Sequence, residues 1–329
     1  MRKLFRRGAL AGLAALPLAP PWISSGAESP AFPDPPLRLI VGFPPGSQSD
    51  LLARLMAPGI GEQLGRAVLV DNKTGANGEA AASSTARSTP DGGVFLLASN
   101  GPTTIAPALG RPLTYDIRTD FAAASPVGFT PMLLVGRPDL QVGNVAELLD
   151  LARVHQGSLK GGSAGIGDQT HLALELFKAM ARLDIVHVPY KGSGPATTDL
   201  MAGQIDIGFA DLSVALPHVR AGRIRGLGQT GLARSAAAPG IATIAESGLP
   251  GYEAVISFGV FMPAGAAPGL VERLNRAVAA TLRSPTVAKK LASLGVDPQF
   301  GSPAEFATYV ARDHAKWAYL AKTAGLRAD

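Results

Sequence analysis

Buried strands alternate with helices along the first third of the chain, and this alternation limits the folds open to it. Residues 37–41 have the apolar composition of a buried strand, and residues 51–56 place leucines and a methionine on one helix face. Strand-like residues 67–70, a helical stretch at 79–87 and strand-like residues 94–98 follow. This order predicts a parallel sheet covered by helices.

The middle of the chain repeats the alternation. Strands and helices are expected in turn over residues 132–135, 145–154, 158–163, 172–180, 185–188, 195–201 and 205–209. After Gly251 the pattern changes to helices, at 270–282, at 287–294 and in a last segment with Phe306 and Trp317 on one face. Two α/β halves joined by short crossings would enclose a cleft at the carboxyl ends of their strands.

The predicted organisation has four parts. Residues 1–27 form a signal peptide, 28–35 a proline-rich leader, 36–125 with 229–329 a first lobe, and 126–228 a second lobe. The two crossings between the lobes are expected near Ser125 to Gly128 and near Gly226 to Gly231. A length of 329 residues with 47% hydrophobic residues provides two cores of ordinary size.

The N-terminal segment has the composition of an export signal. Its basic residues are Arg2, Lys3, Arg6 and Arg7, and it has no acidic residue, so it holds four of the five net positive charges. An apolar stretch at 8–20 and small residues at 25–27 follow, in the order typical of a signal peptide. A membrane anchor is the alternative, but the stretch is shorter than the ~20 residues of a spanning helix. The arginine pair leaves the general secretory and twin-arginine routes open.

Charge and composition exclude several classes of function. The body of the chain is nearly neutral and only 6% of the residues are aromatic, which excludes an extended nucleic-acid surface. No cysteine is present, so disulfides, thiolate metal sites and thiol nucleophiles are excluded. The five histidines, at 155, 171, 187, 218 and 314, show no metal-ligand spacing. We therefore expect a soluble exported protein with no metal and no cofactor.

Three loops should meet in the cleft, at residues 43–50, 99–104 and 163–171. Each combines backbone N–H groups with small hydroxyl or amide side chains, and helix N-termini bind anions. Ser49 or Gln48 is the expected N-cap of the helix after the first loop. No loop offers an obvious base oriented by a third residue, which favours ligand binding over catalysis.

Acidic residues and a histidine in these loops have two interpretations each. Asp50 either complements the positive end of its helix or contacts a ligand. Asp168 is either an N-cap or a ligand contact, and Asp211 could cap the helix that follows it. His171 lies in the first turns of a helix, where it packs or binds a ligand.

A G-x-S-x-G pattern supports an alternative function. Residues 161–165 place Ser163 between a strand and a helix, as in the nucleophile elbow of a secreted serine hydrolase. His218 or His314 would then be the base, with Asp211 or Asp313 as the orienting acid. The pattern is short, lies in a glycine-rich chain and lacks a preceding HGGG-type segment, so binding remains the favoured function.

Several motifs in sequence order resemble one family. The segment Phe43-Pro44-Pro45-Gly46-Ser47-Gln48-Ser49-Asp50 resembles the F-P-P-G-G-x-[ST]-D loop of the solute receptors of tripartite tricarboxylate transporters, the Bordetella uptake gene (Bug) family. Further matches span nearly the whole mature chain, at residues 71–76, 90–92, 113–116, 163–165, 169–172, 187–192, 215–218 and 301–306.

The resemblance implies a fold, a location and a function. It implies a bilobal periplasmic-binding-protein fold of the Venus-flytrap, type II-like class, with α/β lobes around a ligand cleft. It also implies a monomeric periplasmic receptor that performs no chemistry, captures a small organic acid and delivers it to membrane permease subunits.

The resemblance also carries over individual site residues. The matched ligand-binding positions are Phe43, Gly46, Ser49, Asp50, Ser99, Asn100, Gly101, Ser163, Gly165, Gln169 and His171. Ser47, Gln48, Asp168 and Asp211 depart from the family pattern at or beside the expected site. Aspartate beside a ligand carboxylate is unfavourable unless a cation or a donor intervenes, so these departures favour a ligand other than a plain dicarboxylate.

Overall fold

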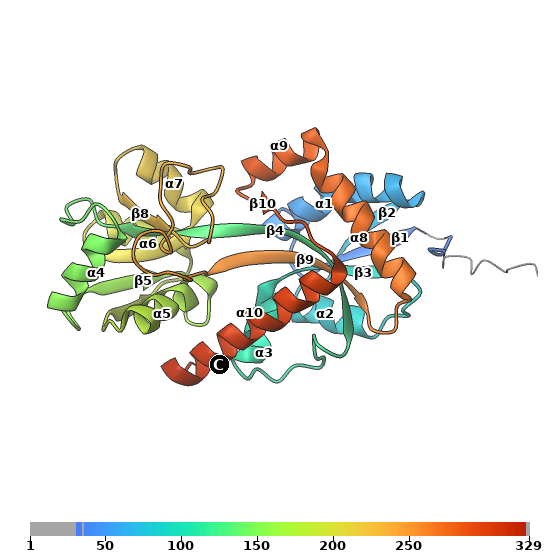
Figure 1. The fold of residues 1–329 in the computed structure, drawn as a ribbon, viewed down its shortest axis with the longest axis horizontal. Helices are drawn as coiled ribbons and strands as arrows, with labels where there is room; N and C mark the ends of the chain where they lie inside the picture. Colours follow the sequence, from blue (N-terminus) through green and yellow to red (C-terminus); the bar gives the residue numbers. More distant parts are fainter. Residues whose placement is uncertain (1–30, 35, 327–329) are drawn as a thin grey trace, which may run out of the picture.

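The computed structural model describes residues 31–34 and 36–326 and shows an α/β protein with two lobes side by side (Figure 1). The predicted signal peptide and part of the leader lie outside these residues. In the described part of the leader, Phe32 is buried in the first-lobe core, and the Arg273 guanidinium lies 5.2 Å from its ring centroid. The end of the leader is therefore packed against the first lobe.

The first lobe begins with the predicted alternation of strands and helices. β1 pairs in parallel with both β2 and β3. The elements are β1 Leu37–Val41, α1 Gln48–Leu64, β2 Val68–Asn72, η1 Ala76–Gly78, α2 Glu79–Ala86, β3 Val94–Ser99, the π-helical turn η2 Gly101–Ile105 and α3 Ala106–Ala108. The C-terminal elements α8 Pro268–Arg283, α9 Pro285–Ser293 and β10 Asp297–Pro298 also lie in this lobe, and α10 Pro303–Ala324 begins in it.

The second lobe repeats the alternation, and β5 pairs in parallel with β6 and β7. Its elements are α4 Val145–Val154, β5 Lys160–Ser163, α5 Gln169–Ala181, β6 Val186–Pro189, α6 Ser193–Met201, β7 Ile207–Asp211, α7 Leu212–Arg220 and β8 Arg225–Gln229. Parallel strands place their carboxyl ends at one edge of each sheet, so the loops that follow β1, β3 and β5 can face the same cleft.

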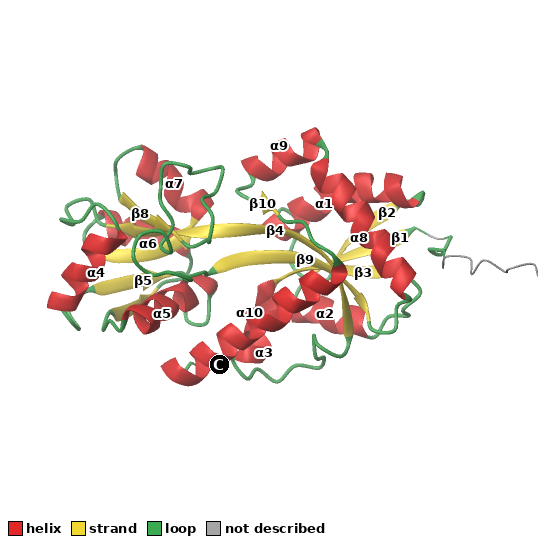
Figure 2. Cartoon of the chain, in the orientation of Figure 1, coloured by secondary structure: helices red, strands yellow, loops and turns green. Residues whose placement is uncertain are grey.

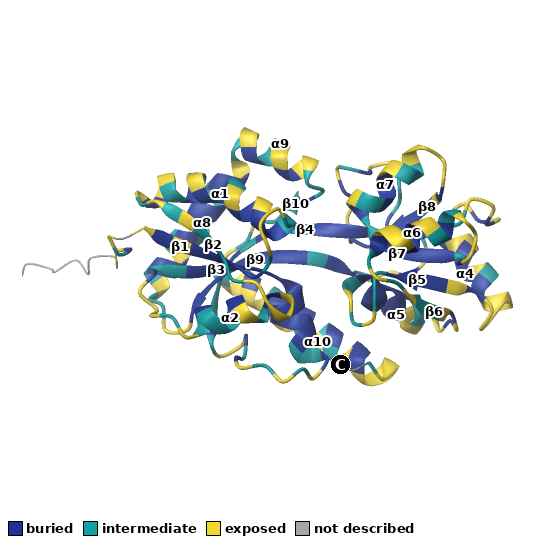
Figure 3. Cartoon of the chain, turned by 180° about the vertical axis from the view of Figure 1, so that it is seen from behind, coloured by how far each residue is buried: buried dark blue, intermediate teal, exposed yellow. Residues whose placement is uncertain are grey.

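Two long strands join the lobes. β4 (Phe121–Gly136) pairs with β9 (Val255–Pro263) through Pro131, with β7 from Met132 onward and with β8 from Leu133 onward. Both strands run between the lobes with largely buried residues (Figure 3). The expectation of helices alone after Gly251 is wrong, because β9 lies there and pairs antiparallel with β3 and β4. The lobe boundaries near residues 125 and 229 stay a prediction.

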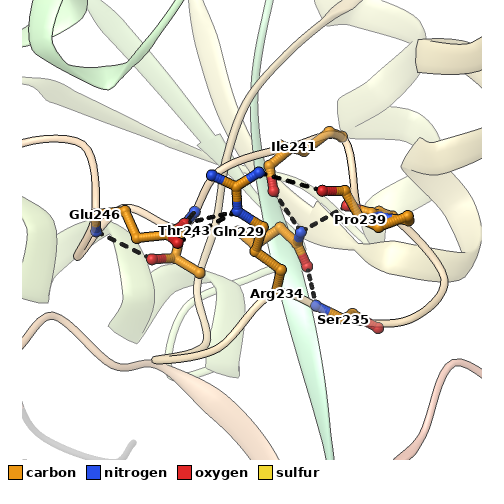
Figure 4. A network of polar contacts seen from close by, with 8 residues as sticks. Gln229, Arg234, Ser235, Pro239, Ile241, Thr243 and Glu246 are labelled. Carbon is orange, nitrogen blue, oxygen red and sulfur yellow. Dashed lines mark hydrogen bonds and ion pairs between the residues drawn. The ribbon is translucent and has the colours of Figure 1, made fainter.

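The segment between β8 and β9 is held by a buried glutamine (Figure 4). The Gln229 side chain donates to the carbonyls of Ala238 and Ile241 at 2.8 and 2.6 Å, and its Oε1 accepts from the Ser235 N–H at 2.9 Å. An ion pair between Arg234 and Glu246, at 2.9 Å, closes the same loop. These contacts fix the return path of the chain toward β9.

The C-terminal helix α10 spans both lobes (Figure 2). Phe306 packs with Phe261 in the first lobe, whereas Trp317 and Leu320 belong to the core that contains Phe177 of the second lobe. Among the described helices, α10 included, none is long and apolar enough to cross a membrane.

Candidate functional site

A cavity of about 210 Å³ lies between the lobes, where the loops after β1, β3 and β5 meet. Its lining residues are Phe43, Ser47, Gln48, Ser49, Asn77, Ser99, Gly101, Ile105, Gly167, Asp168, Gln169, Ile256 and Phe258. The residues expected from the sequence that lie on this wall are Phe43, Ser47, Gln48, Ser49, Ser99, Gly101, Asp168 and Gln169.

The β1–α1 loop is shaped by two glycines. A Cβ on Gly42 would lie 2.5 Å from the Gly78 Cα, so the two backbones are in close contact. Gly46 has a φ of 84°, a conformation that favours glycine, and its N–H donates to Asp50 Oδ2 at 2.9 Å. The N-cap of α1 is Ser47, whose Oγ accepts from the Asp50 N–H. The expectation of Ser49 or Gln48 is therefore wrong, because the tight turn at Gly46 starts the helix earlier.

Asn100 is the anchor of the second loop. It is buried, its Nδ2 donates to the Val255 carbonyl at 3.0 Å, and its Oδ1 accepts from the Ser257 N–H at 3.4 Å. The Thr104 hydroxyl donates to the Asn100 carbonyl and contacts the buried carboxylate of Asp313 at 2.6 Å. The second loop is thus fixed to both β9 and α10.

Gln169 connects the two lobes across the cavity. Its Nε2 donates to Asn100 Oδ1 at 2.6 Å, which joins the start of α5 to the end of β3. Gln48 holds the start of α1 to the joining strand and to the first lobe, because its Nε2 donates to Thr130 Oγ1 of β4 and to the Leu294 carbonyl. We refer to the hydrogen bond between Gln169 and Asn100 as the interlobe bond.

Asp168 caps α5 in the third loop. Its Oδ1 accepts from the Thr170 N–H at 2.8 Å and from the Thr170 hydroxyl at 2.7 Å, while that hydroxyl accepts from the Ala164 N–H. Gly165, with a φ of 152°, contacts the Ser163 hydroxyl through its N–H at 3.3 Å. Asp168 therefore combines the capping role with a place on the cavity wall.

Two stacked histidines contact this loop on the side away from the cavity. The rings of His171 and His187 lie 4.0 Å apart at an angle of 12°, and His171 Nδ1 accepts from the Gly167 N–H. Burial lowers the pKa of His171 and lowers the pKa of His187 to about 4. Both rings are therefore neutral at pH 7, and His171 lies behind the loop and not among the lining residues.

Comparison with known proteins identifies the family. Residues 52–326 match the model of the tripartite tricarboxylate transporter family receptor. The chain belongs to this family. A UPF0065 protein of Pseudomonas sp. strain P51 is 35% identical, with 96% of this chain and 93% of that protein aligned. Protein BugT of Bordetella pertussis is 31% identical over 93% of this chain and 94% of its own length.

Solved structures of similar receptors share the bilobal fold. Rpa4515 of Rhodopseudomonas palustris, solved with adipate, is 36% identical with a TM-score of 0.70, over 90% of this chain and 99% of that one. MatC of the same organism, solved with malate, is 28% identical with a TM-score of 0.68. The match covers 88% of this chain and 99% of that one. A ligand-free receptor from Polaromonas has a TM-score of 0.80 at 23% identity, over 89% of this chain and 100% of that one. At this identity it supports the fold alone.

Asp50 of this receptor is fully engaged within its own loop. The buried carboxylate accepts from Arg54 Nε at 3.0 Å, from Asn72 Nδ2 at 2.9 Å and from the Gly46 N–H. The Arg54 hydrogen bond, reinforced by those of Gly46 and Asn72, lowers the pKa of Asp50 to about 2. Asp50 is not among the lining residues, so the structure places it as a support of the β1–α1 loop.

The contribution of Asp50 to stability should vanish in acid. Its pKa is about 2 in the folded chain against 3.8 for the free side chain, so the stabilisation is present above pH 4 and is lost as the pH falls toward 2. Asp50→Asn should therefore lower the free energy of unfolding by about 1 to 2 kcal/mol at pH 7 and by little near pH 2. Urea unfolding at both pH values measures this difference. Exposed Asp150→Asn is the control, and an equal loss at both pH values would contradict the prediction.

Asp211 lies at the end of β7, directly before α7, but its side chain makes no capping hydrogen bond. Its Oδ2 accepts instead from the Ser193 hydroxyl at 2.9 Å. Burial raises the pKa of Asp211, and the nearby Asp168 carboxylate raises it further, against the Ser193 hydrogen bond. The expectation that Asp211 caps α7 is thus wrong, because its carboxyl group is held by Ser193, and Asp211 is not among the residues that line the cavity.

Ser163 contacts a histidine that the hydrolase alternative did not include. Its Oγ lies 2.6 Å from His187 Nε2, because β5 and β6 pair with Gly161 opposite His187. Ser163 is fully buried, with 0% of its surface exposed, so an ester carbonyl could reach it only after the loop opened. The position suits a hydroxyl that fixes the loop better than one that attacks a substrate.

Five lining residues were missed by the sequence analysis: Asn77, Ile105, Gly167, Ile256 and Phe258. Ile256 and Phe258 alternate along β9, a strand that the periodicity did not reveal. Asn77 has a left-handed φ of 54° and directly follows the segment at 71–76 that resembles the family. Its place beside that segment was the sequence feature that could have indicated it as a site residue. Gly167 lies inside the predicted third loop.

Proposed function

We propose that the chain is an extracytoplasmic receptor that captures a small organic acid in the cavity between its lobes. The observation that carries the proposal is the composition of the cavity wall. Ser47, Gln48 and Ser49 present hydroxyl and amide groups at the N-terminus of α1, a helix of 17 residues, and that terminus attracts a carboxylate. The adipate and malate held by the similar R. palustris receptors support this class of ligand.

Ligand capture would bring together the two proposed lobes, residues 36–125 with 229–329 and residues 126–228. β4 and β9 are the strands that join them and serve as the hinge. Because the interlobe bond joins one side chain from each lobe, it stabilises the closed arrangement. A ligand that touches both walls would then favour closure by differential binding.

The export signal at residues 1–27 supports a periplasmic location. From there a monomeric receptor would deliver its acid to the permease subunits of a tripartite tricarboxylate-type transporter, in keeping with the family. The proposed activity is binding without chemistry and without a cofactor. The receptor family and the burial of Ser163 both support it.

Adipate, malate and succinate should be screened by thermal shift and the best ligand measured by calorimetry. A ligand at one hundred times its Kd should stabilise the protein by about 2.7 kcal/mol. Ser49→Ala, which removes a hydroxyl from the cavity wall, should weaken binding about fivefold, and Ser88→Ala on the surface should not.

An ester assay decides between the receptor and the hydrolase. The receptor should release no product from p-nitrophenyl acetate. The contact between Ser163 and His187 is the observation that favours the alternative. Ester turnover that Ser163→Ala abolishes, together with no stabilisation by any organic acid, would contradict the proposed function.

A further inference from the structure

Asn100, the acceptor of the interlobe bond, is held by groups outside the cavity. It is 2% exposed and is not among the lining residues. Its Nδ2 donates to the Val255 carbonyl at 3.0 Å, which turns its Oδ1 toward Gln169. The interlobe bond therefore depends on how the backbone at Asn100 is fixed, because a rotation of this residue would misalign its Oδ1 with the Gln169 amide.

Thr104 fixes that backbone from one turn further along the chain. Asn100 directly precedes the π-helical turn Gly101–Ile105, a rare conformation that occurs often at functional sites. The Thr104 hydroxyl shares its proton between the Asn100 carbonyl at 3.1 Å and Asp313 Oδ2 of α10 at 2.6 Å. A hydrogen bond to a carboxylate is stronger than one between neutral groups, so Thr104 ties the start of the turn to α10.

Lys316 completes this set of contacts at the start of β9. Its Nζ forms an ion pair with Asp313 Oδ1 at 2.9 Å and donates to the Glu253 carbonyl at 3.1 Å. Glu253 lies two residues before Val255, whose carbonyl accepts from Asn100. The polar chain, as we call these linked side chains, consists of Asn100, Thr104, Asp313 and Lys316. It holds α10, the π-helical turn and the start of β9 in one arrangement.

The polar chain meets α10 where this helix passes from one lobe to the other. Phe306, near its start, packs with Phe261 in the first lobe, and Trp317 belongs to the core that contains Phe177 of the second lobe. Asp313 lies between these two contact regions and is 2% exposed. A change in its position would therefore accompany any movement of α10 relative to either lobe.

We propose that Thr104, Asp313 and Lys316 are positioning residues for the interlobe bond and set how readily the lobes close around the ligand. They act through Asn100, because they hold its Oδ1 where the Gln169 amide meets it in the closed arrangement. This inference rests on the proposed receptor function and adds to it three residues that are not among those lining the cavity. α10 thereby contributes to closure from outside the site.

Thr104→Val breaks the polar chain with little change in shape, because a methyl group replaces the hydroxyl. Thr103→Val is the matched control, since Thr103 is also 2% exposed and its hydroxyl donates to the Ser99 carbonyl within the same turn, at 3.0 Å. Thr104→Ser keeps the hydroxyl and should behave as the wild type. Lys316→Gln, at the partly exposed end of the polar chain, should act in the same direction as Thr104→Val.

Closure can be measured without a ligand. The chain has no cysteine, so two introduced cysteines are the only sites for spin labels. Exposed Gln63→Cys in α1 and Val154→Cys at the end of α4 place one label on each lobe. Double electron–electron resonance on the full mature chain then gives the ratio of closed to open molecules. Thr104→Val should lower this ratio about threefold, and Thr103→Val should not change it.

A double-mutant cycle distinguishes positioning from a general loss of stability. In calorimetry with the tightest-binding of adipate, malate and succinate, Thr104→Val should weaken binding about threefold. Combined with Gln169→Ala, it should cause no further loss, because the interlobe bond that it positions is already absent. A general loss of structure would instead add to the effect of Gln169→Ala.

The outcomes separate this proposal from the receptor function. If Thr104→Val matches Thr103→Val, or lowers the closed-to-open ratio equally with and without Gln169, the positioning role is overturned and the receptor stands. If no organic acid binds while Thr104→Val lowers the ratio only when Gln169 is present, the receptor function falls and the positioning role stands. Unchanged circular dichroism in the variants shows that each of them is folded.

Discussion

Gly42→Ala should abolish ligand binding and destabilise the protein by about 1 to 3 kcal/mol or more. The added Cβ would lie 2.5 Å from the Gly78 Cα and 3.1 Å from the Gly78 carbonyl oxygen. Both atoms belong to the backbone, so no rotation of a side chain can relieve the contact. The strand end must move, and with it Phe43 on the cavity wall.

Urea unfolding and calorimetry with the best organic acid measure the two effects of this substitution. Gly194→Ala is the matched control, since a Cβ at that position in α6 meets no atom within 4 Å. The control should be neutral or up to about 1 kcal/mol more stable. Wild-type affinity in Gly42→Ala would show that the close contact with Gly78 does not shape the site.

Gln169→Ala should weaken ligand binding about tenfold with little change in the stability of the free protein. The substitution removes the interlobe bond, whose donor and acceptor come from different lobes. A hydrogen bond of this kind contributes about 0.5 to 1.5 kcal/mol, and its loss shifts the population away from the closed arrangement. Gln169→Glu should weaken ligand binding more than Gln169→Ala, because it places a carboxylate oxygen against Asn100 Oδ1 and two acceptors repel each other.

Calorimetry and small-angle X-ray scattering with and without ligand measure the effect of Gln169→Ala. The wild type should contract when ligand is added, and the variant should need more ligand to contract. Gln141→Ala removes an exposed glutamine whose Nε2 bonds only within its own loop, to the Asp139 carbonyl, and serves as the control. Equal ligand affinities of Gln169→Ala and the wild type would show that the interlobe bond does not contribute to closure of the lobes.

Local patterns predicted most of the secondary structure. The helix expected at 145–154 is observed as Val145–Val154, because its apolar residues have helical spacing and Asn144 caps it. β1 and β3 also lie within a residue of their expected positions, since buried parallel strands are short apolar runs.

The two strands of the hinge were harder to predict. β4 contains Pro126, Gly128 and Pro131, which interrupt any strand pattern, and both β4 and β9 are buried on both faces along most of their length. Neither strand therefore shows an alternation of polar and apolar residues. Their pairing also joins residues more than 120 positions apart, which only the folded topology can specify.

The sequence by itself determined the family, the alternation of strands and helices and the loops that line the cavity, because these depend on local composition and on motifs contiguous in the chain. Only the tertiary structure decided which side chains meet across those loops. Asn100 and Gln169 are 69 positions apart, Gln48 and Leu294 are 246 apart, and His187 reaches Ser163 because β5 and β6 pair in one register. The contact between Asn100 and Gln169 depends on how the two lobes are placed relative to each other, and the other two depend on how elements pack within one lobe. No local pattern encodes either arrangement.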